Sequence, residues 1–147
     1  MININTNDIK TMSIKIKELN DKSIKNIQRC VVKSTYTIER NAKNNLAKNG
    51  SVKTGHLRRS LNSNIKMGGS KTTGEVSTNV FYAIFVEKGT NPHLIRPKRK
   101  KALYWKGAPH PVKLVRHPGG KKKPYLIPAF DNEVPNFIKE IEKAVDF

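Results

Sequence analysis

The chain has 147 residues, enough for one domain with a core of ordinary size, and a formal net charge of +18. Its single cysteine excludes an internal disulfide framework, and no apolar run approaches the ~20 residues that cross a bilayer. The N-terminus lacks the basic, apolar and small-residue order of a signal peptide, so we expect a soluble protein made in a reducing cytoplasm.

The positive charge is concentrated in one segment. Residues 94–123 carry 11 basic side chains and no acidic one, whereas residues 124–147 carry 2 basic and 5 acidic ones. Because like charges repel, such a block either meets a polyanion or stays solvated. An AT-rich genome would also supply many lysines, but that bias alone would not remove every acid from one segment.

The N-terminal third predicts a loose start followed by a long helix. Residues 1–11 are polar, and residues 12–17 alternate with period two, as a short edge strand would. The helix is expected over residues 20–48, capped by Asn20-Asp21 and ended by Asn49-Gly50. Its apolar stripe consists of Ile24, Ile27, Val31, Ile38 and Ala42, widened by Cys30, Val32, Tyr36 and Leu46. A buried structural thiol is expected at Cys30.

A helical turn and a hairpin should follow. Leu57 and Leu61 are four residues apart, which suits one turn docked by its apolar edge, with Thr54 as a possible cap. Arg58 and Arg59 would then face solvent or a partner. Residues 62–67 and 75–79 are predicted strands, joined by a flexible loop over residues 68–74.

The stretch from Val80 to Thr90 predicts the central strand of the sheet. It is the densest aromatic and β-branched run of the chain, and both of its alternating faces are apolar. Gly89 and Pro92 would end the strand. Glu87 is expected to be a strand-end residue that pairs with a neighbouring base.

The last third predicts two short strands and a helix. Residues 102–105 and 112–115 form either a second hairpin or an excursion from the sheet, within a sheet region over residues 62–116 and a basic loop over residues 94–123. A helix is expected over residues 131–146, with Asp131 or Asn132 as its cap and Pro135 in its first turn. The expected fold is a single α+β domain, in which a long N-terminal helix and a C-terminal helix pack on a small, mostly antiparallel sheet.

The residues do not assemble a catalytic or metal site. The four histidines are His56, His93, His110 and His117; none pairs with another at helical spacing. No second carboxylate or nucleophile accompanies Glu87, and the glycine pairs lack the pattern of a phosphate-binding loop. We therefore expect no enzyme activity, no metal and no cofactor.

Four segments in register resemble a known family. They are Thr54-Gly55-His56-Leu57-Arg58-Arg59-Ser60-Leu61, Tyr82-Ala83 with Val86-Glu87-Lys88-Gly89-Thr90, His93 to Lys98 with Lys101-Ala102-Leu103, and Pro124-Tyr125-Leu126-Ile127-Pro128-Ala129. They are similar to segments of the HK97 gp10-like family of tailed-phage neck and tail-completion proteins. The matching positions that we take as structural or assembly residues are Thr54, Gly55, Leu57, Arg58, Ser60, Tyr82, Ala83, Val86, Glu87, Gly89, Thr90, Pro128 and Ala129. The N-terminal third carries no segment that matches.

The resemblance implies a structural subunit of a phage particle or a prophage-derived one. Such a subunit is assembled in the host cytoplasm, forms a ring that is hexameric in the particle, and joins the head connector to the tail. Its partners would be its own copies, the adjoining head-connector protein and the tail-terminator or tube protein. No membrane contact is implied.

An autonomous nucleic-acid-binding protein is the alternative hypothesis. Basic runs flank Tyr104 and Trp105, and basic residues interleaved with aromatic ones suit sequence-independent binding of a nucleic-acid backbone. In either case we expect two exposed tips, held to the body by residues 102–105 and 112–115. These tips would contact the DNA path or an acidic partner through Lys98, Arg99, Lys100, Lys101, Lys121, Lys122 and Lys123.

Overall fold

The computed structural model describes residues 21–68 and 71–145. The predicted long helix is confirmed as α1, Asp21–Lys48, and it ends where Gly50 takes a positive φ of 66°. The loose start over residues 1–11, the predicted strand over residues 12–17 and the cap residue Asn20 lie outside the described part of the chain.

One face of α1 carries the buried stripe. Ile27, Ile38, Ala42 and Leu46 are buried, and the other predicted members Ile24, Cys30, Val31 and Val32 are half-buried. Tyr36 is the exception, because it is 55% exposed. It lies two residues from Ile38, and two residues turn a helix by about 200°, so the two side chains leave on opposite sides.

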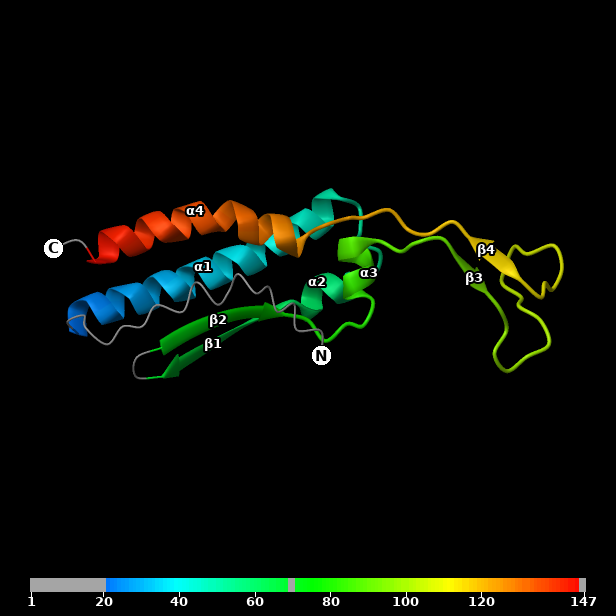
Figure 1. Ribbon diagram of the computed structural model, residues 1–147, viewed down its shortest axis with the longest axis horizontal. Coiled ribbons are helices and arrows are strands. Elements are labelled where there is room, and N and C mark those ends of the chain that lie inside the picture. Colours follow the sequence, from blue (N-terminus) through cyan, green and yellow to red (C-terminus); the bar gives the residue numbers. More distant parts are fainter. Residues whose placement is uncertain (1–20, 69–70, 146–147) are drawn as a thin grey trace.

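The predicted hairpin is confirmed, with a shorter loop. Strand β1, Asn62–Gly68, pairs antiparallel with β2, Lys71–Ser77, and Gly68 lies opposite Lys71. Residues 71–74, predicted as part of the loop, continue the ladder because strand pairing uses backbone groups and tolerates threonine well. Figure 1 shows the hairpin along one side of α1, which separates it from the C-terminal helix.

The predicted central strand is wrong, because Val80–Thr90 contains a short helix. Helix α3, Ala83–Lys88, buries Ala83 and Glu87, which lie four residues apart on one helical face. Phe81 and Phe85 are 77% and 52% exposed, although a central strand would have buried both. The other short helix, α2, His56–Ser60, confirms the predicted turn: Leu57 and Leu61 are buried, whereas the Arg58 and Arg59 side chains are exposed.

Residues 90–120 form an arm that projects from the body (Figure 1). Strand β3, His93–Ile95, pairs antiparallel with β4, Val115–His117, and a single bridge joins Leu103 to Val112 farther out. The excursion is therefore correct, but its ladder lies at β3 and β4, and the predicted strands over residues 102–105 and 112–115 are joined to each other by the Leu103–Val112 bridge alone. Residues 102–105 and 112–115 do not hold the segment to the body, since Leu103 and Val112 bond to each other.

The C-terminal helix α4, Leu126–Val145, begins five residues before the predicted start. Pro128 occupies its first turn, where a missing N–H costs nothing, and Pro135 lies in its interior. The helix packs along α1, and Ser34 Oγ donates a buried hydrogen bond of 2.8 Å to Glu133 Oε1 between them. The predicted α+β class is confirmed, with α1 between α4 on one side and the hairpin on the other.

Candidate partner-binding surface

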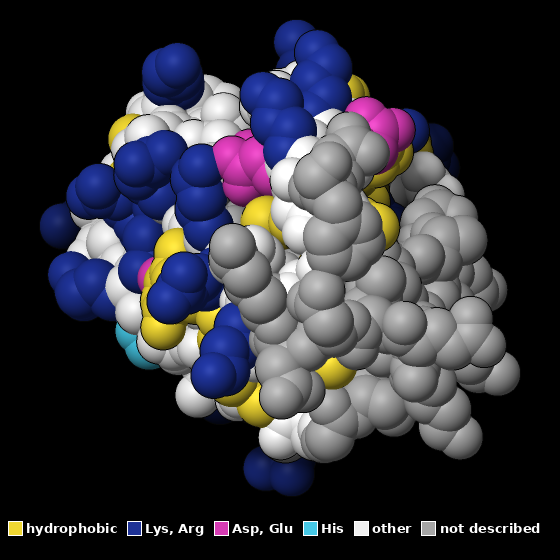
Figure 2. Space-filling model, turned by 90° about the vertical axis from the view of Figure 1, so that its left-hand side faces the viewer, with side chains coloured by type: hydrophobic (Ala, Val, Ile, Leu, Met, Phe, Trp, Pro, Cys, Tyr) yellow, Lys and Arg dark blue, Asp and Glu magenta, His cyan; other side chains and the backbone are white. Residues whose placement is uncertain are grey.

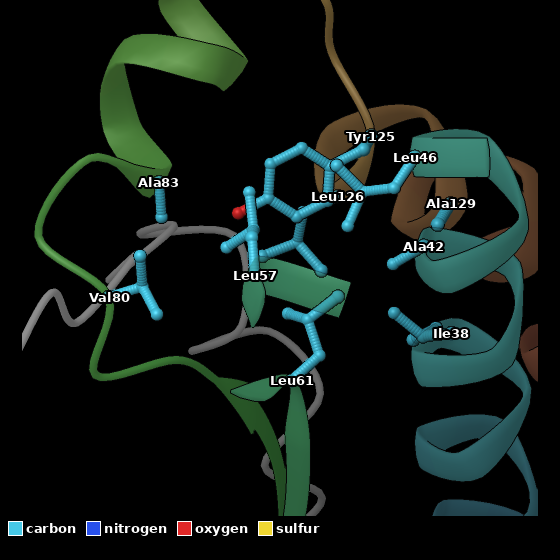
Figure 3. Close-up of a cluster of buried hydrophobic side chains, with 10 residues drawn as sticks. All are labelled: Ile38, Ala42, Leu46, Leu57, Leu61, Val80, Ala83, Tyr125, Leu126 and Ala129. Atoms are coloured by element: carbon cyan, nitrogen blue, oxygen red, sulfur yellow. The ribbon is translucent and has the colours of Figure 1, made fainter. Parts of the chain in front are cut away.

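Three of the four family-like segments meet at one end of α1, and the segment from His93 to Leu103 lies on the arm. A single core joins α1, α2, α3 and the start of α4, and Figure 3 shows its side chains pointing toward one another. Its members are Ile38, Ala42, Leu46, Leu57, Leu61, Val80, Ala83, Tyr125, Leu126 and Ala129. The family-like residues Leu57, Ala83 and Ala129 therefore belong to one structural unit, although Leu57 and Ala129 are 72 residues apart in the sequence.

Glu87 connects α3 to α4. Its side chain is only 4% exposed, and Oε2 accepts the backbone N–H groups of Tyr125 and Leu126 at 2.9 and 3.0 Å. Oε1 accepts the N–H group of Ile127 at 3.0 Å. A carboxylate at a helix N-terminus satisfies amides that have no partner inside the helix and faces the positive end of the helix dipole. Glu87 is thus the cap of α4, and the expected pairing with a base and the expected caps Asp131 and Asn132 are wrong.

The arm is fastened to the body at its base. Thr90 and Gly120 exchange backbone hydrogen bonds of 3.0 and 3.1 Å, and the Lys123 N–H group donates to the Val86 carbonyl at 2.9 Å. Gly89 and Gly119 have φ of 72° and 88°, and a Cβ at Gly119 would lie 2.3 Å from the Thr90 carbonyl oxygen. The two crossing strands approach too closely for any residue with a side chain.

The arm is basic and carries exposed apolar side chains. Between Glu87 and Asp131 the chain has no acidic residue. Lys98, Arg99, Lys100 and Lys101 are exposed, as expected, and so are Leu94, Tyr104, Trp105 and Leu114. At the base of the arm the rings of His93 and His117 stack with centroids 4.9 Å apart.

The structure separates the two predicted tips. Residues 98–101 lie out on the arm, whereas Lys121, Lys122 and Lys123 are exposed on the segment that returns to α4. There Lys121 and Lys123 line a groove of about 430 Å³ together with Arg58 of α2 and Phe85 of α3. This groove has no acidic residue in its lining, so it favours an anionic partner.

The remaining family-like residues surround the same unit. Thr54 and Arg58 are exposed; Gly55, Ser60, Tyr82, Val86, Gly89, Thr90 and Pro128 are half-buried. Thr54 Oγ1 accepts the His56 N–H group at 3.4 Å, although the residue at the cap position itself is Gly55. Ser60 Oγ bonds to Thr78 Oγ1 at 2.6 Å and so ties α2 to the end of β2. The exposed Arg58 side chain forms no hydrogen bond or ion pair with the described residues, so it can contact a partner.

Basic side chains also gather at the end of the molecule that is opposite the arm (Figure 2). Lys25, Arg29 and Lys33 line shallow hollows there, and Lys33 forms an ion pair with Glu140. Cys30 lies in the same region, where burial and the nearby Glu140 carboxylate raise the pKa of its thiol. A thiol that resists ionisation is a poor nucleophile and a poor metal ligand.

Within the described residues, no group of three or more histidine, cysteine, aspartate or glutamate side chains could hold a metal ion. Nor does any helix in residues 21–68 and 71–145 have the length and apolar character that crossing a membrane requires.

Comparison with known proteins identifies a family. The model of the family described as "Bacteriophage HK97-gp10, putative tail-component" matches residues 10–89, which is more than half of the chain. The match includes α1, the hairpin, α2 and α3, and it ends before the arm and α4. No curated protein and no solved structure matched the chain. The chain belongs to the HK97 gp10-like family, and it is a structural tail component of a phage particle.

Proposed function

We propose that the chain is a neck or tail-completion subunit that assembles as a ring and joins the head connector to the tail. The observation that carries this proposal is the family membership over residues 10–89. The projecting arm supports it, because an arm with exposed apolar side chains suits a protein that is completed by its neighbours. The role is structural, in a ring that we take to be hexameric, and it needs no metal or cofactor.

The basic residues of the arm would face DNA that passes through the ring or an acidic surface of the adjoining protein. Lys98, Arg99, Lys100 and Lys101 are exposed, and neither of the ion pairs in the described structure involves them. Contact with DNA would be independent of base sequence and would weaken steeply with salt, because lysine and arginine release counterions from phosphates.

Deleting the gene tests the proposal. Heads and tails should then accumulate separately, or filled heads should lose their DNA, and supplying the protein in trans should restore joined particles. Normal, infectious particles without the protein would contradict the proposal. The role of the arm charges is tested by a variant in which Gln replaces Lys98, Arg99, Lys100 and Lys101. A control variant, in which Gln replaces Lys25, Lys48, Lys66 and Lys71, has the same change in net charge. Full infectivity of the arm variant would show that these charges have no binding role.

A nucleic-acid-binding protein that acts alone is the second candidate, and one observation favours it. Tyr104 and Trp105 are exposed beside basic residues, where bases of a single strand could stack on them. This candidate predicts that the isolated subunit binds a single-stranded oligonucleotide at physiological salt and that Trp105→Ala weakens the binding at least tenfold. Binding of duplex alone, insensitive to Trp105→Ala, would instead favour the ring.

A further inference from the structure

The exposed side of α4 is divided into two edges of different chemistry. One edge carries Ile127, Asp131, Pro135, Ile138 and Glu142, which follow one another at intervals of four, four, three and four residues and so share a stripe. We call these five residues the α4 stripe. The other edge carries Asn132, Asn136, Lys139 and Lys143. The stripe thus combines exposed apolar and acidic side chains.

The α4 stripe holds two exposed acids. Among the acidic residues whose exposure the structure describes, only Asp131 and Glu142 are exposed. Neither forms an ion pair with a described residue. Ile127 and Ile138 are 41% and 50% exposed, which places large aliphatic side chains in water beside these carboxylates. Exposed apolar residues rimmed by charge are typical of a protein–protein contact.

The arm has the complementary character. It carries basic residues without an acid, and it exposes the apolar side chains Leu94, Trp105 and Leu114. Its strands are only three residues each, and a two-stranded ribbon of this size is marginally stable by itself. The arm therefore fits a partner that buries apolar surface and supplies negative charge.

The arm and the α4 stripe of one chain do not meet. Figure 1 shows the arm leaving the body near the start of α4 and extending away from that helix. The stripe from Ile127 to Glu142 is about 22 Å long at 1.5 Å per residue. The nine Cα-to-Cα steps from Leu94 to Leu103 span about 30 Å when extended, so the arm is long enough to cover the stripe of another copy.

We propose that the arm of one copy lies along the α4 stripe of the next copy. Leu94, Trp105 and Leu114 would cover Ile127 and Ile138, and arm bases would pair with Asp131 and Glu142. The two surfaces differ, so the contact is head-to-tail, and repeated contacts of this kind close into a ring when the rotation permits. This inference rests on the proposed ring and names the interface that builds it. Nucleic acid suits the arm less well, because a phosphate backbone gives Leu94 and Leu114 nothing to bury against.

Two variants test the contact in solution, and each carries one altered surface and one intact surface. The arm variant carries Trp105→Ser and Leu114→Ser; the stripe variant carries Asp131→Lys and Ile138→Lys. All four positions are exposed, so both variants should fold. Each variant should stay monomeric alone, and the mixture should give a 1:1 heterodimer in sedimentation equilibrium, with an association constant at least tenfold above that of either variant with itself.

Fluorescence reports the same event. Trp105 is the only tryptophan of the chain, and in the mixture only the stripe variant retains it. Its emission should shift to shorter wavelength when the arm variant is added. The control adds Lys139→Ser and Lys143→Ser, on the other edge of α4, to the arm variant; it should pair with the stripe variant as the arm variant does. No heterodimer and no spectral shift at concentrations where the wild type self-associates would overturn the contact.

If the wild type stays monomeric in solution, photo-cross-linking in the assembled particle tests the contact instead. With p-benzoylphenylalanine in place of Trp105, irradiation of assembled particles should cross-link this position to residues 127–142 of another copy. Cross-links to DNA, or to a different protein, would overturn the inference. If they occur while the ring remains necessary for joining head and tail, only the inferred interface is wrong; if particles are complete without the gene, the proposed function is wrong.

Discussion

Removing the Glu87 carboxylate should destabilise the whole fold. In Glu87→Ala three backbone amides, those of Tyr125, Leu126 and Ile127, lose their acceptor in a buried site. Each hydrogen bond to a charged group contributes about 1.5–3 kcal/mol, and water that enters the space left by the side chain recovers part of this. We therefore expect a loss of about 3–5 kcal/mol, a large part of the 5–15 kcal/mol that is ordinary for a domain. The start of α4 should fray, and the arm should lose its anchor at Lys123.

Urea unfolding followed by circular dichroism measures this loss, and hydrogen exchange at residues 125–127 locates it. Glu87→Gln keeps the shape and one carbonyl acceptor, so it should cost about half as much. Glu142→Gln, at an exposed position of the same helix, should stay within about 0.5 kcal/mol of the wild type. A Glu87→Ala protein that is as stable as the Glu142→Gln control would show that Glu87 does not stabilise the start of α4.

Three further changes probe the core and its titrating groups. Tyr125→Phe should leave stability unchanged or raise it by about 1 kcal/mol, because the buried Tyr125 hydroxyl has no hydrogen-bond partner among the described residues. Burial raises the pKa of Tyr125, so wild-type stability should fall as the pH rises above the ordinary tyrosine value of about 10, and a pH series of urea midpoints should show a smaller fall in the variant. Gly74→Ala should cost about 1–3 kcal/mol, because its Cβ would lie 1.8 Å from Thr35 Oγ1, and adding Thr35→Ala should recover part of the loss; a fully additive double variant would contradict this. Burial acts to raise the pKa of Glu39, but hydrogen bonding, chiefly from Lys43, outweighs it and leaves the pKa lowered. The stability that Glu39 contributes is therefore present above the ordinary glutamate pKa of about 4.3 and lost as the pH falls below it. An acid titration of stability should show this loss in the wild type and not in Glu39→Gln.

Features set by local periodicity were predictable from the sequence. Helix α1 is long enough for its apolar stripe to repeat several times, and Gly50 supplies the positive φ that ends it. The hairpin and the paired leucines of α2 were found in the same way. In each case the signal lies within the element itself.

Features set by distant partners were not predictable. The apolar run from Val80 to Val86 is too short for its period to separate a strand from a helix, and the decisive fact is that Glu87 faces α4. The partners of Glu87 are 38 to 40 residues away, so neither its role nor the true start of α4 was visible from nearby residues. The sequence did hold one indication of this contact, because Glu87 and the segment Pro124–Ala129 are both among the family-like residues.

For a similar reason, the charge of the arm was predictable from the sequence and its strand pairing was not. Its charge excess is a property of composition and needs no fold, but the strand pairs are fixed where Thr90 meets Gly120 and where Gly119 permits a close crossing. The apolar residues 102–105 and 112–115 suggested strands by propensity, whereas backbone geometry at the base placed the ladder at β3 and β4. The exposed Tyr104 and Trp105 then follow from their position on a projecting arm.

The place of the protein in the particle is the most direct test of the proposed ring. Electron cryo-microscopy of the purified phage, focused on the region between head and tail, should resolve a closed ring whose subunits contain the paired helices α1 and α4, with each arm reaching the next subunit. The same density should be missing from particles made without the gene. A complete head–tail junction that contains no copy of this chain would contradict the account.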